Sequence, residues 1–354
     1  MERVMEPTTV SSPEQGIEMQ AQSATSVIRE GNKRLMVVSG RASQELAGKI
    51  ADRLDVELSP VTLKTFSNGE VYCRYEESVR GADIFIVQST CGNEAAGISA
   101  NDALMELLVM IDAAVGASAH RVIAVTPWYG YSRQDKKSAP REPITARLVA
   151  KMMERAGADR VLTMDLHAGQ VQGFFSKPVD HMTAMPILTQ YISDQHIGDD
   201  LVVVSPDAGR VKLAKKFASK LGAELAILNK ERPAHQVAEI GYVIGDVKGK
   251  TAILVDDMID TAGTLCAAAQ TVHDEGASRV IAAATHPVLS GSAFENLDSS
   301  PLEQIVVTDT IPMRPGAPEK IKVITVADIL TDSIRRIFSD DSVSEIFAGE
   351  NQLF

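Results

Sequence analysis

Short apolar runs alternate with helix-forming stretches from Lys33 onward, and this alternation restricts the possible folds more than any other feature of the chain. The apolar runs are Leu35–Val38, Ile84–Val87, Val122–Val125, Val161–Met164, Leu201–Val204, Ala252–Val255, Val280–Ala283 and Ile305–Val307. The amphipathic or alanine-rich stretches between them include Gln44–Leu54, Leu104–Val115, Thr145–Ala156, Val211–Leu221 and Ala262–Glu275. Strand and helix patterns that alternate in this way predict an α/β protein with parallel sheets.

The number of predicted strands fits two similar halves, each with a mainly parallel sheet flanked by helices. A chain of 354 residues is long enough for each half to bury a core of its own. We expect an N-terminal domain over residues 33–177 and a C-terminal domain over residues 178–320. Residues 1–32, rich in Ser, Thr, Gln and Glu, are predicted to form a disordered leader, and residues 321–354 to pack back on the N-terminal domain.

The charge balance and the cysteines exclude several classes of protein. A net charge of −12 and a pI near 5.1 argue against a general nucleic-acid or membrane-surface binder. Any anionic substrate must therefore be held by a local group of cations or by a metal ion. The three cysteines form no CxxC pair and no apolar run approaches a membrane span, so we expect a cytoplasmic protein without a nucleic-acid or membrane partner.

Several predicted strands end in polar groups that are suited to binding. These groups are Gln88–Thr90, Asp165–His167, Ser205–Asp207, Asp256–Asp257 and Thr285–His286. Open α/β sheets bind ligands in the crevice at the carboxyl ends of their strands. We therefore expect these side chains to line one or more crevices.

The most informative of these strand ends is the stretch from Thr251 to Thr264. A buried strand leads into the acids Asp256 and Asp257, and the small-residue turn Asp260–Thr264 then opens a helix. Backbone N–H groups of such a turn can hold one phosphate group, whereas the acids suit the hydroxyls of the same ligand, and ribose 5-phosphate has both. At Gly263 a Cβ is expected to meet the phosphate or to require a changed backbone angle. The alternative is an acidic turn followed by a capped helix.

Three other segments have a functional and a structural interpretation. The loop Thr126–Pro143 is dense in aromatic and cationic groups, which suits a base and a polyphosphate or else a solvated basic loop. His167 follows a strand and is a candidate for a metal or phosphate contact, or a structural histidine. Asp207 either begins a turn or binds Mg²⁺ at the mouth of a crevice.

Two further segments carry weaker signals. Lys230 and Arg232, separated by Glu231, are predicted to lie in a loop, where they would reach one polyphosphate or simply face solvent. The segment Phe66–Glu70 is typical of a turn between two strands.

Together these segments resemble the ribose-phosphate diphosphokinases, also called phosphoribosyl diphosphate (PRPP) synthetases. The resemblance runs from about Lys33 to Phe347 and is most specific at Asp165–Asp180, Pro140–Thr145 and Asp256–Thr264. It implies two phosphoribosyltransferase-type domains and a homo-oligomer, usually a hexamer. It also implies Mg²⁺-dependent transfer of the diphosphoryl group of ATP to the 1-hydroxyl of ribose 5-phosphate, which gives PRPP and AMP for nucleotide biosynthesis.

The resemblance also implies roles for individual residues. The ATP contacts would be Phe66, Asn68, Gly69, Glu70, Arg133 and Gln134, with the Phe66 region reaching the site of a neighbouring subunit. Magnesium would be held by His167 and Asp207, and the catalytic cations would be Lys230 and Arg232. Ribose 5-phosphate would contact Arg232, Asp256, Asp257, Asp260, Thr261, Ala262, Gly263 and Thr264.

Three residues depart from the family's pattern, and two rival functions share part of it. Glu231 stands where many relatives carry a basic residue, Arg210 where a second glycine is common, and Trp128 where another aromatic is usual. A phosphoribosyltransferase would share the Asp256–Thr264 stretch but would need neither the Arg133 loop nor the loop cations. A catalytically silent regulatory homologue would keep the fold and lose site residues, whereas every matched position is filled here.

Overall fold

A computed structural model describes residues 28–30, 33–198, 200–234 and 237–347. Within these ranges the side chains of residues 28–30, 208, 230–234, 237–241 and 347 are not described. The predicted leader thus lies almost wholly outside the described residues, except that Ile28–Glu30 form strand β1.

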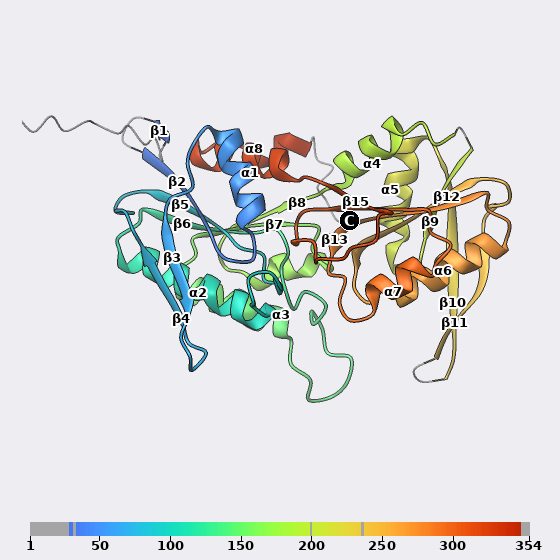
Figure 1. Cartoon of the computed structure of the whole chain (residues 1–354), viewed down its shortest axis with the longest axis horizontal. Coiled ribbons are helices and arrows are strands. Elements are labelled where there is room, and N and C mark those ends of the chain that lie inside the picture. Colours follow the sequence, from blue (N-terminus) through green and yellow to red (C-terminus); the bar gives the residue numbers. More distant parts are fainter. Residues whose placement is uncertain (1–27, 31–32, 199, 235–236, 348–354) are drawn as a thin grey trace, which may run out of the picture.

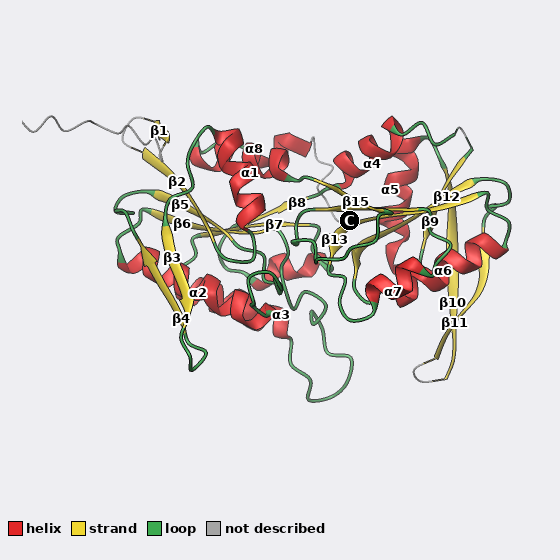
Figure 2. Cartoon of the chain, in the orientation of Figure 1, coloured by secondary structure: helices red, strands yellow, loops and turns green. Residues whose placement is uncertain are grey.

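Two mainly parallel sheets form the frame of the described chain (Figures 1 and 2). The first has the order β1-β2-β5-β6-β7-β8, with β2 at Lys33–Ser39, β5 at Asp83–Val87, β6 at Arg121–Thr126, β7 at Arg160–Met164 and β8 at Val179–Met182. The second has the order β11-β10-β9-β12-β13-β14-β15. Its strands are β9 at Leu201–Ser205, β10 at Glu224–Ala234, β11 at Val237–Ile244, β12 at Thr251–Ile259, β13 at Arg279–Pro287, β14 at Gln304–Thr308 and β15 at Ile321–Ile324.

The two sheets repeat one plan. In each described half, five parallel strands lie side by side in chain order, and a β-hairpin interrupts the chain after the first of them. In the first half this hairpin is β3 (Val61–Thr65) with β4 (Val71–Tyr75), which form a separate two-stranded sheet. In the second half it is β10 with β11, which extends the main sheet. The prediction of an α/β fold built from two similar halves is confirmed.

Helices cover both faces of the sheets (Figure 1). The upper face in that view carries α1 (Gln44–Leu54), α4 (Met185–Asp194), α5 (Val211–Leu221) and α8 (Ala327–Phe338). The lower face carries α2 (Ala100–Gly116), α3 (Thr145–Ala156), α6 (Gly263–Asp274) and α7 (Ala293–Asp298). The upper helices share one continuous core across both halves, whereas the lower face has separate cores for α2–α3 and α6–α7.

The burial of strand β2 on both faces explains its uninterrupted apolar sequence. Leu35 and Val37 belong to the upper core, and Met36 and Val38 belong to the lower one. All four side chains are fully buried. Successive side chains of a strand point to opposite faces, so a parallel strand between two helix layers is apolar at every position.

All eight predicted apolar runs are strands, and α1, α3 and α5 begin and end where their patterns predicted. The hydrogen bonding shifts the limits of the two halves. Strand β8 pairs with β7 in the first sheet, beyond the boundary expected at residues 177/178. Strand β15 pairs with β14 in the second sheet, although residues 321–354 were expected to pack back on the N-terminal domain.

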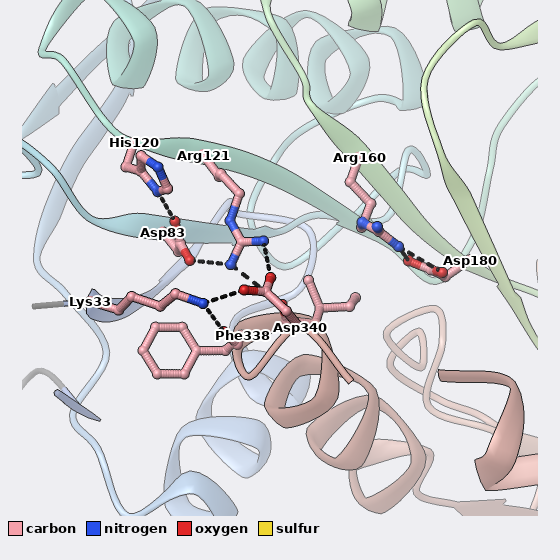
Figure 3. Close-up of polar contacts among 9 residues, drawn as sticks. Lys33, Asp83, His120, Arg121, Arg160, Asp180, Phe338 and Asp340 are labelled. Atoms are coloured by element: carbon pink, nitrogen blue, oxygen red, sulfur yellow. Dashed lines mark hydrogen bonds and ion pairs between the residues drawn. The ribbon is translucent and has the colours of Figure 1, made fainter. Parts of the chain in front are cut away.

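Helix α8 returns to the first half and packs on α1 (Figure 1). Arg121 bridges Asp340, just after α8, to Asp83, which is buried at the start of β5 (Figure 3). Lys33 pairs with Asp340, and His120 Nδ1 lies 2.7 Å from Asp83 Oδ1. These contacts, here called the α8 clasp, fix the end of α8 to the amino ends of β2, β5 and β6.

A separate ion pair joins the last two strands of the first sheet. Arg160 Nη1 donates to both carboxylate oxygens of Asp180, at 3.0 and 2.7 Å (Figure 3). No helix of the described residues is long and apolar enough to cross a membrane.

Candidate functional site

A cavity of about 620 Å³ lies where the carboxyl ends of strands from both halves meet. The first half supplies His167, after β7, and Arg133, from the loop after β6. The second half supplies Asp207 and Arg210 after β9, and the Asp256–Asp257 pair on β12. Four sequence-predicted groups from distant segments, Arg133, His167, Asp207 and the Asp256–Asp257 pair, therefore meet at one site, as expected for the ligand crevice of an open α/β sheet.

His167 and Asp257 make a direct contact between the halves within this cavity. His167 Nδ1 lies 2.7 Å from Asp257 Oδ2 and 2.7 Å from Arg210 Nη2. One ring nitrogen either donates or accepts, so it cannot serve both partners. A lone pair on Nδ1 would face the carboxylate at that distance, so the favoured tautomer carries its proton on Nδ1 and donates to Asp257. The lone pair of the imidazole is then on Nε2.

The two neighbouring acids have opposite pKa shifts. Burial raises the pKa of Asp256 well above its usual value, and the adjacent charge of Asp257 adds to this effect. Burial acts in the same direction on Asp257, but the hydrogen bond from His167 and the charge of Arg210 outweigh it and lower the pKa of Asp257 to about 2. Asp257 is therefore a permanent carboxylate, and Asp256 is the partner that more readily takes up a proton.

None of the residues of the Asp260–Thr264 turn lines the cavity, and the turn is connected to it through the contact of Asp260 with Arg133. Asp260 Oδ2 is 2.6 Å from Arg133 Nη1, and Arg133 itself lines the cavity. Ala262 has a left-handed backbone with φ of 62° and precedes α6, whose first residue is Gly263. The first backbone N–H groups of a helix have no partner within the helix, so this turn presents donors for an anion.

The expectation for Gly263 needs a correction. Its φ is not positive, and a Cβ built on it meets no atom within 4 Å. The backbone angle that disfavours most side chains belongs to Ala262 instead. The protein thus leaves room for a Cβ at Gly263.

The structure does not bring every predicted site residue to the cavity. Phe66, Asn68, Gly69 and Glu70 form the tip of the β3–β4 hairpin and are not among the lining residues. Phe66 is 43% exposed and meets Tyr72 edge to face at 5.8 Å between ring centroids.

Three other predicted site residues, Gln134, Lys230 and Arg232, are not among the described residues that line the cavity. Gln134 does not line the cavity, and its Oε1 accepts a hydrogen bond of 2.6 Å from Thr145 Oγ1. The backbone of Lys230 and Arg232 lies in strand β10, not in the predicted loop, because β10 and β11 form one long irregular hairpin. Their side chains lie outside the described part of the structure.

The sequence did not reveal the role of Asp165 and Thr285, which join the two halves beside the cavity. Asp165 Oδ2 accepts hydrogen bonds from Thr285 Oγ1 at 2.7 Å and from Ala184 N at 2.8 Å. Asp165 also has a positive φ of 33°, which is a strained backbone conformation for a residue other than glycine. Both residues had been singled out at strand ends, but only the packing of the two sheets shows that they pair.

His286 and Trp128 form a buried layer close to these contacts. His286 is fully buried, its Nδ1 lies 2.9 Å from Thr310 Oγ1, and its Nε2 lies 3.1 Å from the backbone oxygen of Met164 in the other half. Burial lowers the pKa of His286. The ring of Trp128 packs on His286 at 4.8 Å between centroids, so this departure from the family's pattern is a core residue.

Family models and known proteins match this architecture over most of the chain. Residues 35–157 match the N-terminal domain of ribose phosphate pyrophosphokinase, and residues 226–348 match a phosphoribosyl synthetase-associated domain. A ribose-phosphate pyrophosphokinase of Caldanaerobacter subterraneus is 52% identical over 314 residues, which cover 88% of this chain and 98% of that protein. The protein of the same name from Chlorobaculum tepidum is 50% identical over 317 residues, which cover 90% and 96%.

The chain belongs to the ribose-phosphate pyrophosphokinase family. A crystal structure of phosphoribosylpyrophosphate synthetase from Mycobacterium smegmatis has the same fold, with a TM-score of 0.80 and 46% identity. The matched region spans 99% of that chain and 86% of this one. The predictions of the family and of an enzyme of this class are confirmed. Membership of this family supports synthesis of PRPP from ribose 5-phosphate, and it speaks against the rival function of a phosphoribosyltransferase.

Proposed function

We propose that the chain transfers the diphosphoryl group of ATP to the 1-hydroxyl of ribose 5-phosphate with the help of Mg²⁺, giving PRPP and AMP. The observation that carries the proposal is the meeting of Asp256–Asp257 and His167 in one cavity between the halves, together with the contact of Asp260, in the Asp260–Thr264 turn, with the lining residue Arg133. The acids offer acceptors for sugar hydroxyls, and the turn offers donors for the 5-phosphate.

The residues around His167 fit a magnesium ion that is shared with substrate phosphates. Asp257 accepts the Nδ1 proton of His167 and leaves the Nε2 lone pair available, which is the usual arrangement of a metal-binding histidine. Asp207 lines the same cavity. No group of three or more His, Cys, Asp or Glu side chains in the described residues could hold a metal. This suits Mg²⁺, which takes one or two protein ligands and completes its shell with phosphates and water.

The nucleotide is assigned to the Arg133 side of the cavity and to a second subunit. Arg133 lines the cavity and pairs with Asp260, and its guanidinium can leave Asp260 to bind a phosphate of the nucleotide. Phe66 does not line the cavity of its own chain, and its exposed ring is available to a neighbour. Phe66 would stack on adenine there, with Asn68, Gly69, Glu70 and Gln134 as further ATP contacts. The proposal therefore includes a homo-oligomer, which we expect to be a hexamer. We expect the protein to be located in the cytoplasm.

Diphosphoryl transfer requires alignment and charge neutralisation more than covalent help from the protein. The sugar oxygen attacks the β-phosphorus in line, and AMP leaves with the electron pair of the broken bond. Mg²⁺ supplies charge neutralisation on the phosphates when it is bound. Lys230 and Arg232 are assigned to the charge that develops in the transition state, where one preorganised donor contributes roughly 3 kcal/mol. No residue is assigned as general base.

The test is an incubation of the protein with Mg²⁺-ATP and ribose 5-phosphate, with AMP and PRPP measured by chromatography. We expect equal amounts of the two products, and AMP only when the sugar is present. A parallel incubation with excess chelator should form neither. A folded protein that forms no AMP under these conditions would instead be the silent regulatory homologue.

A further inference from the structure

The β3–β4 hairpin is a separate two-stranded sheet that carries Phe66 at its tip, and in Figure 1 this tip extends beyond α2. Its inner face packs through Val61 and Leu63 on the lower core, and Tyr75 Oη donates to the backbone oxygen of Met110 at 2.8 Å. These contacts act mainly at the end where Val61 pairs with Tyr75. A two-stranded hairpin is only marginally stable by itself, so the tip needs a further contact to keep Phe66 in one place.

Arg41 makes this contact near the tip of the hairpin. It lies in the turn between β2 and α1, and its Nη2 donates to Thr65 Oγ1 at 3.0 Å. Thr65 is the last residue of β3 and directly precedes Phe66. Side chains of a strand alternate between its faces, so Thr65 lies on the same face as Leu63. Arg41 therefore continues toward the tip the attachment that the apolar side chains of this face begin.

The guanidinium of Arg41 is fixed from the interior of the protein. Its Nε pairs with Oε2 of Glu106, a fully buried residue of α2. The other oxygen, Glu106 Oε1, accepts the backbone N–H of Arg41 at 2.7 Å. A buried carboxylate requires a compensating cation, so this pair is costly to break. A planar guanidinium can donate to Glu106 through Nε and to Thr65 through Nη2 at once, which the single ammonium of lysine cannot do with the same geometry.

Gln88 joins the turn of Arg41 to α2. It is fully buried directly after β5, and its Nε2 donates to Glu106 Oε1 at 2.9 Å, while its Oε1 accepts the backbone N–H of Ala42 at 3.0 Å. The sequence predicted that Gln88 lines a crevice, but it is not among the residues that line the cavity. Its amide is used inside the protein instead. Arg41, Gln88 and Glu106 are here called the Arg41 anchor.

We propose that the Arg41 anchor positions the β3–β4 hairpin: it holds Thr65 and so sets the place of the Phe66 ring that is offered to the neighbouring subunit. The proposal rests on the proposed function for the contact between Phe66 and adenine. The anchor belongs to the chain that provides the hairpin, and it supports affinity for ATP in a site whose sugar-binding residues belong to another copy. Arg41 acts through Thr65 and is a positioning residue.

The test uses Thr65→Val, which replaces the hydroxyl with a methyl group and leaves the buried Arg41–Glu106 pair intact. Thr65→Ser restores the hydroxyl. Thr62→Val is the matched control, because Thr62 lies on the same strand and its Oγ1 donates to Glu76 instead, at 2.6 Å. The kcat and the KM values for ATP and for ribose 5-phosphate are measured for each variant, alone and combined with Phe66→Ala. Hydrogen exchange followed by mass spectrometry reports on the backbone amides of residues 61–75.

Thr65→Val should raise the KM for ATP about threefold or more, since a hydrogen bond to a charged group is lost, and should leave kcat and the KM for ribose 5-phosphate unchanged. The amides of the hairpin tip should exchange faster. Thr65→Ser and Thr62→Val should match wild type in both measurements. In the Phe66→Ala background Thr65→Val should raise the KM for ATP no further, because the anchor acts through the ring that is already absent.

The assignment is overturned if Thr65→Val keeps the KM for ATP and the hydrogen exchange of wild type. It is also overturned if the variant raises both KM values equally, or if its effect persists in full without the Phe66 ring, because the hydroxyl would then support the fold in general. If Phe66→Ala itself leaves the KM for ATP unchanged, the proposed contact with adenine fails. Hydrogen exchange at the tip then still decides whether the Arg41 anchor holds the hairpin.

Discussion

Asp256 and Asp257 are neighbours in the chain, yet their surroundings give them different tasks. Asp257 is held by His167 and Arg210 and stays ionised, whereas burial raises the pKa of Asp256. The sequence showed two equivalent acids at the end of a strand. The difference arises from His167, which comes from the other half of the molecule.

The acid pair should make stability depend on pH in two opposite ways. The pKa of Asp257 is lowered to about 2, so its contribution is present above the unfolded value near 4 and is lost as pH falls below it. The pKa of Asp256 is raised, so its contribution is present below that value and is lost as pH rises. Urea unfolding should show that Asp257→Asn weakens the loss of stability at acidic pH.

The Asp256→Asn variant is the control for this measurement. It should leave the acidic loss unchanged and reduce the loss of stability at higher pH. Identical pH profiles for the two variants would mean that the acids are not differently held.

A second prediction at this scale concerns the phosphate turn. Gly263→Val should weaken ribose 5-phosphate binding at least tenfold and leave binding of a non-hydrolysable Mg²⁺-ATP analogue unchanged, because the turn is assigned to the 5-phosphate and the protein leaves room for the added Cβ. Calorimetric titration with each ligand measures this. Gly48→Val is the matched control, since Gly48 is also helical with no atom within 4 Å of its added Cβ. Normal sugar binding by a folded Gly263→Val protein would place the phosphate elsewhere.

At the scale of elements, α8 shows how a segment far along the chain is tied to the first sheet. Its apolar face joins the upper core with α1, and the α8 clasp fixes its end to the amino ends of three strands. Asp83 is 1% exposed, so its ion pair with Arg121 is buried, whereas the Arg53–Asp328 pair between α1 and α8 is exposed. Burial decides which of these pairs matters for stability.

We expect Arg121→Met to lower the free energy of unfolding by roughly 3 kcal/mol or more, because it leaves Asp83 buried with too little compensating charge. Asp328→Asn joins the same comparison as control and should cost less than about 1 kcal/mol, because its side chain is 70% exposed. Urea unfolding measures both. Equal effects of the two substitutions would contradict this account of the clasp.

At the scale of the whole molecule, the two halves act as one body around a shared site. The upper core runs through strands of both sheets, and Asp165 and His286 join the halves beside the cavity. The Phe66 hairpin is the exception, because it lies outside the cavity of its own chain. A complete site therefore requires a second copy of the chain under the proposed function.

Mixing of two defective subunits tests this requirement. Phe66→Ala and Asp256→Asn should each have low activity, because one lacks the adenine contact and the other lacks the sugar acceptor. After dissociation and reassembly of an equal mixture, about a quarter of the sites should combine an intact hairpin with an intact acid pair. Activity above that of either variant is the expected outcome. A mixture with only the average of the two activities would show that Phe66 does not act across subunits.

The sequence by itself determined the elements and most of the chemistry. A continuous apolar run forms a strand that is buried on both faces, whichever position the strand takes in the sheet, so the pattern alone predicted eight strands. Amphipathic spacing alone predicted helices such as α1 and α5. The Asp256–Thr264 stretch was recognised because a strand, two acids and a small-residue turn follow one another locally. These features depend on neighbours in the chain.

The tertiary structure decided which groups meet. Strand β8 joined the first sheet, and β10 replaced the loop expected at Lys230 and Arg232, because hydrogen bonding between strands fixes those limits. Arg210 was only a departure from a pattern until the fold placed it between Asp257 and His167. Contacts between residues 43 and 90 positions apart depend on the packing of two sheets, which no local pattern in the chain records.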